Sequence, residues 1–187
     1  MRRSFLLLFC LALVAVAPAA AQDVELPAGF DEPMPLHHDG KGLGPFSREI
    51  TTSSPEAQLY FDQGIQLLYA FTPNDAARSF REAWKADPNC AMCYFGEAWA
   101  WGSYLNGPMT APDAPRAYAA IQRALDVSGD YATDAERALI KAMSVRYEEA
   151  HDADRRRELD ELWAQEIKKT YAQHPTDLDA GFLAGES

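Results

Sequence analysis

The chain has 187 residues, of which 48% are hydrophobic, and it carries a formal net charge of −11 at pH 7. This length suits one domain or part of one, and the apolar content is ample for a packed core. A surface this acidic repels phosphate backbones and anionic headgroups, which argues against nucleic-acid binding and favours a neutral or basic partner.

The first 21 residues have the features of a secretory signal peptide. Arg2 and Arg3 give a positive start, an apolar run follows at 4–16, and alanines at 19–21 supply small residues for cleavage. The apolar run is too short to span a membrane. We therefore expect a protein that is exported, to a bacterial periplasm or outside the cell, without a stable membrane span after cleavage.

Residues 22–54 are predicted to form an irregular, partly mobile leader, because prolines and glycines interrupt any helical or alternating period. The run His37-His38-Asp39 could suggest a metal site. Neighbouring side chains of an extended segment point apart, however, and no third ligand is close in sequence. We interpret this run as a solvated polar turn and predict no metal site.

Two places have the spacing of a capping box, in which a serine or threonine precedes a glutamate by three residues. The first is Ser53 with Glu56, and the second is Thr133 with Glu136. Each is expected to begin a helix.

Small residues recur at fixed spacings in the sequence that follows Ser53 and Glu56. Ala76 follows Gly64 by twelve residues, and Ala98 follows it by thirty-four, with Phe80 between them and Pro88 after the second predicted helix. Small residues let two helices approach closely, a large aromatic fills the space beside them, and proline ends a helix. This 34-residue period is typical of a helix–turn–helix repeat.

The stretch 57–101 resembles the tetratricopeptide (TPR) repeat family, with Tyr60 where that family usually has tryptophan. The resemblance implies an all-α protein, an α-solenoid that presents a groove to a partner and performs no reaction. The expected repeat domain covers 55–187, with repeats at about 57–90, 91–130 and 132–175 and the start of a fourth at 178–187.

The partial fourth repeat suggests that the chain is an N-terminal fragment of a longer array, because solenoids need a polar capping helix. A short helical tail is the alternative.

The resemblance also places a concave, apolar and aromatic groove on the first helix of each repeat. By register, its residues are Phe61, Ile65 and Tyr69 in the first repeat and Phe95 and Trp99 in the second. Large aromatic side chains at such a surface suit the anchoring of a protein or peptide partner. The alternative is that the leader or the rest of the array covers them.

Cys90 and Cys93 are the most specific candidate in the sequence for a chemical role. At this spacing on a helix the Cα atoms lie about 5 Å apart, within disulfide range. A local disulfide or a buried thiol pair is one interpretation, and a metal or redox role is the other. Tyr94 follows Cys93 where covalent haem attachment needs histidine, and two further zinc ligands at a matching spacing are missing.

No nucleophile–base pair, phosphate loop or metalloprotease motif is present in the sequence. We therefore predict an exported, non-catalytic TPR-type scaffold without a cofactor that binds a protein or peptide. The alternative function is a periplasmic metal- or redox-handling protein that uses Cys90 and Cys93.

Overall fold

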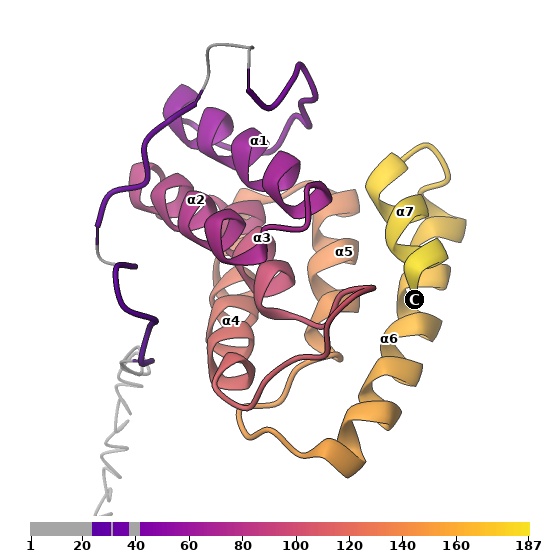
Figure 1. Ribbon diagram of the computed structural model, residues 1–187. Helices are drawn as coiled ribbons and strands as arrows, with labels where there is room; N and C mark the ends of the chain where they lie inside the picture. Colours follow the sequence, from indigo (N-terminus) through magenta and orange to yellow (C-terminus); the bar gives the residue numbers. More distant parts are fainter. Residues whose placement is uncertain (1–23, 31, 38–41) are drawn as a thin grey trace, which may run out of the picture.

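The computed structural model describes residues 24–30, 32–37 and 42–187 (Figure 1). Within these ranges the regular structure is all α-helix and there is no strand, which confirms the all-α part of the prediction, while the solenoid arrangement stays a prediction. The helices are α1 (Pro55–Tyr69), α2 (Pro73–Ala86), α3 (Ala91–Trp101), α4 (Asp113–Tyr131), α5 (Asp134–Ser144), α6 (Ala153–Gln173) and α7 (Leu178–Glu186). The predicted signal peptide lies outside the described residues, as do His38 and Asp39.

Among the helices in the described ranges, none has both the length and the apolar character that crossing a membrane requires.

Side-chain caps mark the beginnings of α1, α3, α5, α6 and α7. Thr133 and Glu136 form the predicted capping box at α5, with bonds in both directions. The predicted box at α1 is wrong, because the N-cap of α1 is Ser54, whose hydroxyl accepts from the Ala57 amide. The amide of Ser53 instead donates to the carboxylate of Asp87, at the end of α2. Ser53 therefore does not cap α1.

Each helix packs against the next one in sequence, and the alternate pairs α1–α3 and α3–α5 also touch (Figure 1). One hydrophobic core extends through the contacts from α1 to α7. Helix α3 lies at its centre, since every residue of α3 is buried. Consecutive helices therefore lie side by side along the chain.

The ring of Phe80, on α2, is fully buried between two glycines of neighbouring helices. A Cβ atom added to Gly64 of α1 would lie 2.6 Å from this ring, and one added to Gly96 of α3 would lie closer still. The period predicted Ala98 as the small residue on the third helix. Ala98 is buried, but the missing Cβ of Gly96 is what makes room for the ring.

The described parts of the leader have no helix or strand, yet side chains of α1 bind their backbone. Tyr60 donates to the carbonyl of Met34 at 3.0 Å. The Gln63 amide group donates to the carbonyl of Pro35 at 3.1 Å and accepts from the amide of His37 at 2.6 Å. Residues 34–37 of the leader thus lie along α1.

Residues 47–53 of the leader, which we call the anchor segment, bind both ends of the helical region. Asp62 of α1 accepts from the Arg48 amide at 3.0 Å. The Arg48 guanidinium pairs with Asp177 at 2.9 Å and with Asp179, at the beginning of α7. Because Arg48 is itself largely buried, this ion pair holds α7 against the leader.

Two further carboxylates bind the anchor segment. Glu136 accepts from the amide and the hydroxyl of Thr51 at 2.8 and 2.6 Å, and Asp87 accepts from the Thr52 hydroxyl at 2.6 Å. Burial alone would raise the pKa of each carboxyl. The hydrogen bonds outweigh burial, so the pKa of Glu136 and that of Asp87 lie below their usual values.

We predict that Gly64→Ala lowers the free energy of unfolding by about 1–3 kcal/mol, because the added methyl group overlaps the Phe80 ring. Gly129→Ala is the matched control. Gly129 lies in α4 with open space around its Cα, so alanine is expected to raise stability by up to about 1 kcal/mol. Urea unfolding measures the free energy of unfolding of both variants. Equal changes in the two variants would show that Gly64 is not in close contact with Phe80.

We also predict that low pH destabilises the fold, because it protonates the carboxylates that bind the anchor segment. A carboxyl whose folded pKa is depressed contributes stability above its unfolded pKa of about 4, and this contribution is lost as the pH falls through the folded pKa. Glu136→Gln should therefore be less stable than wild type at pH 7 and should lose less stability between pH 6 and pH 3. Glu149→Gln, at an exposed position, is the control in urea unfolding across this range. A pH dependence that Glu136→Gln leaves unchanged would contradict the prediction.

Candidate functional site

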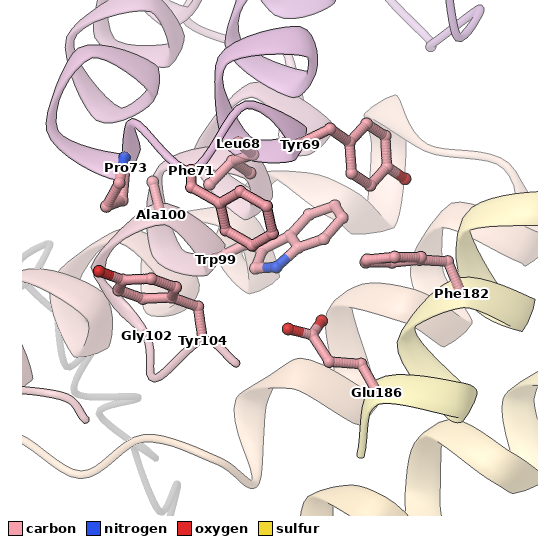
Figure 2. A pocket seen from close by; sticks show the side chains of 10 residues that line it. All are labelled: Leu68, Tyr69, Phe71, Pro73, Trp99, Ala100, Gly102, Tyr104, Phe182 and Glu186. Atoms are coloured by element: carbon pink, nitrogen blue, oxygen red, sulfur yellow. The ribbon is translucent and has the colours of Figure 1, made fainter. Parts of the chain in front are cut away.

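An apolar cavity of about 110 Å³ lies where the end of α1, the end of α3 and helix α7 meet (Figure 2). This volume accommodates several water molecules or one side chain. Its lining residues are Leu68, Tyr69, Phe71, Pro73, Trp99, Ala100, Gly102, Tyr104, Phe182 and Glu186. A pocket of this kind, with aromatic walls and one carboxylate, is the candidate functional site.

Of the five residues predicted to line a groove, Tyr69 and Trp99 border this cavity. Their rings meet edge to face at a centroid distance of 6.1 Å. Phe61, Ile65 and Phe95 are instead buried in the core and offer no open surface. The binding role therefore stays a prediction for Tyr69 and Trp99, within a smaller site than the sequence suggested.

Helix α7 supplies the wall of the cavity opposite α1. The Phe182 ring lies edge to face against Tyr69, with centroids 4.9 Å apart. The Tyr69 hydroxyl donates to Asp179 at 2.6 Å. Burial and this hydrogen bond raise the pKa of Tyr69, so its phenol stays protonated. Arg48 also pairs with Asp179, and the anchor segment thereby fixes this wall.

Phe71 lies at the cavity in an unusual backbone conformation. Helix α1 ends in a Schellman motif, in which the amide of Phe71 donates to the carbonyl of Leu68 and the amide of Thr72 to that of Leu67, both at 3.0 Å. The residue at this position takes a positive φ, which is 60° for Phe71. Glycine is usual there because any side chain adds a cost of about 1–2 kcal/mol. The Phe71 side chain nevertheless stays 55% exposed.

Sequence reasoning missed Phe71, Tyr104, Phe182 and Glu186. A signal for Phe71 exists, since it precedes Thr72-Pro73, at the helix end where glycine would be expected. No local signal brings Phe182 or Glu186 to α1 and α3, because that contact depends on the tertiary position of α7.

The sulfur atoms of Cys90 and Cys93 lie at bonding distance, 2.00 Å, and the Cα atoms are 5.3 Å apart. This confirms the predicted geometry of a local disulfide. Cys90 is the N-cap of α3, and its sulfur accepts from the Cys93 amide. Both residues are fully buried, so the pair is enclosed by the core and not open to a substrate.

In the ranges that the structure describes, no group of three or more histidine, cysteine, aspartate or glutamate residues could hold a metal ion. His37 lies in the described leader, where its amide binds Gln63.

Comparisons with protein-family models, with curated proteins and with solved structures found no match to this chain.

We predict that Phe71→Gly raises the free energy of unfolding by about 1 kcal/mol, because glycine adopts the positive φ without strain. Ala70→Gly is the control, since Ala70 has a φ of −84° and glycine there is expected to destabilise. Thermal and urea unfolding of the two variants provide the measurement. A clear loss of stability in Phe71→Gly would mean that the ring contributes more by packing than its backbone costs.

Proposed function

We propose that this chain is an exported, TPR-like helical scaffold that binds a peptide segment of a partner protein at the aromatic cavity, without catalysis. Two helices lie in each of the three expected repeat ranges, which supports a stacked arrangement of helical hairpins. The contacts of α1 with α3 and of α3 with α5 also support it, because stacked repeats bring alternate helices together.

Export is supported by the basic and apolar start of the sequence and by the cysteine pair at bonding distance. Disulfides persist in oxidising compartments such as a periplasm or the extracellular space. The two sulfur atoms are buried and engaged with each other, which does not support the alternative of metal or redox handling.

The strongest support for docking at the cavity is the strained backbone and high exposure of Phe71. Its backbone conformation costs stability, and its ring is more exposed than covered, so folding alone does not account for a phenylalanine there. Strained residues that persist cluster at functional sites. Exposed aromatic side chains beside a pocket are also the residues that dominate binding energy at protein interfaces.

The leader shows how α1 binds an irregular stretch of polypeptide. Side chains of Tyr60, Gln63 and Gln66 bind its carbonyl groups, which is recognition of backbone and not of sequence. Because the leader itself occupies this surface of α1, a partner peptide would bind beyond it and place one side chain in the cavity, where shape and aromatic contacts supply selectivity.

The test is selection of peptides from a random display library on the wild-type protein, followed by calorimetric titration of the selected peptides. We expect Phe71→Ala and Tyr104→Ala each to weaken binding tenfold or more, as removal of an aromatic anchor does. Tyr131→Ala is the matched control, because Tyr131 is 45% exposed at the end of α4 and outside the cavity. Selected peptides that bind wild type and both cavity variants equally would refute the proposal.

A further inference from the structure

Glu186 is the one charged residue in the wall of the aromatic cavity. Figure 2 shows its carboxylate pointing from α7 toward the Trp99 indole, beside the Phe182 ring. Among residues 24–30, 32–37 and 42–187, it has no hydrogen-bond or ion-pair partner. The nearby Asp179, in contrast, is engaged by both Arg48 and Tyr69. Within these ranges the exposed carboxylate at the cavity is therefore available to an occupant.

The remaining lining residues define what that occupant can be. None of them is a lysine, arginine or histidine, so the wall carries one negative charge and no positive charge. The faces of aromatic rings attract cations, and the attraction grows as water is excluded. Glu186 is exposed at the rim of the cavity, so its carboxylate would repel an anionic occupant and attract a cationic one, while adding nothing for a neutral one. The net charge of −11 also favours the approach of a basic partner.

We propose that the cavity takes a lysine side chain of the partner peptide, with its ammonium group at Glu186 and its hydrocarbon stem against the aromatic wall. This inference rests on the proposed docking function and specifies its partner. The cavity volume of about 110 Å³ suits a single unbranched stem. Lysine fits because it joins a flexible four-carbon stem to a compact charge.

The test uses small probes that separate charge from apolar contact: n-butylammonium chloride, n-butanol and sodium butyrate, which share a short alkyl chain. The readout is the NMR signal of the Trp99 indole N–H. The chain has four tryptophans, so this signal is identified by its loss in Trp99→Phe. We expect n-butylammonium to bind with a Kd at least fivefold lower than that of n-butanol at low salt, and butyrate to bind most weakly. The preference should shrink in 0.5 M NaCl because salt screens the charge.

Glu186→Gln should remove the preference for n-butylammonium and retain the binding of n-butanol. Glu149→Gln, which changes the net charge equally but at an exposed site outside the cavity, should keep the preference. Equal affinity of wild type for n-butylammonium and n-butanol, or a preference that survives Glu186→Gln, would overturn the lysine assignment and leave apolar docking intact. If no probe shifts the Trp99 signal, the lysine assignment and the docking function both fail.

Discussion

The packing of Phe80 between Gly64 and Gly96 is the constraint on which the rest of the structure depends. One ring on α2 touches the backbones of α1 and α3, and neither helix could approach so closely with a larger residue. Dense packing of this kind leaves little freedom in how three helices cross. Since Tyr69 lies at the end of α1 and Trp99 near the end of α3, this contact fixes the relative position of two walls of the cavity, to which α7 adds a third.

The acidic character of the chain has a structural use as well as a solubility effect. Carboxylates from three separate places, at Asp62, Asp87 and Glu136, bind one short irregular segment, and Asp177 and Asp179 bind its arginine. Hydrogen bonds lower the pKa of Asp87, Glu136 and Asp177 despite the burial of these carboxyls. α7 is held in place by this arrangement, and α7 in turn supplies one wall of the cavity. Glu186 differs because it faces the cavity and stays unpaired within the described ranges.

Much of the helical architecture could be predicted from the sequence because its signals are local. The period of Gly64, Phe80 and Pro88 indicated two packed helices, and Thr133 with Glu136 indicated a helix start. The spacing of Cys90 and Cys93 was within range of a disulfide, without excluding a thiol pair or a metal or redox role. The path of the leader could not be predicted in this way, because its contacts join residues far apart in the sequence, as Arg48 and Asp177 do. For the same reason, sequence analysis placed Phe61, Ile65 and Phe95 on an open groove, whereas the structure buries them.

The most direct test of the central packing is an NMR measurement of nuclear Overhauser effects between the ring protons of Phe80 and the Hα protons of glycines in the unmodified protein. The structure predicts strong effects to both Gly64 and Gly96, because the ring contacts the two backbones at once. An effect to only one of these glycines, or to neither, would contradict the arrangement of α1, α2 and α3 and with it the position of the cavity.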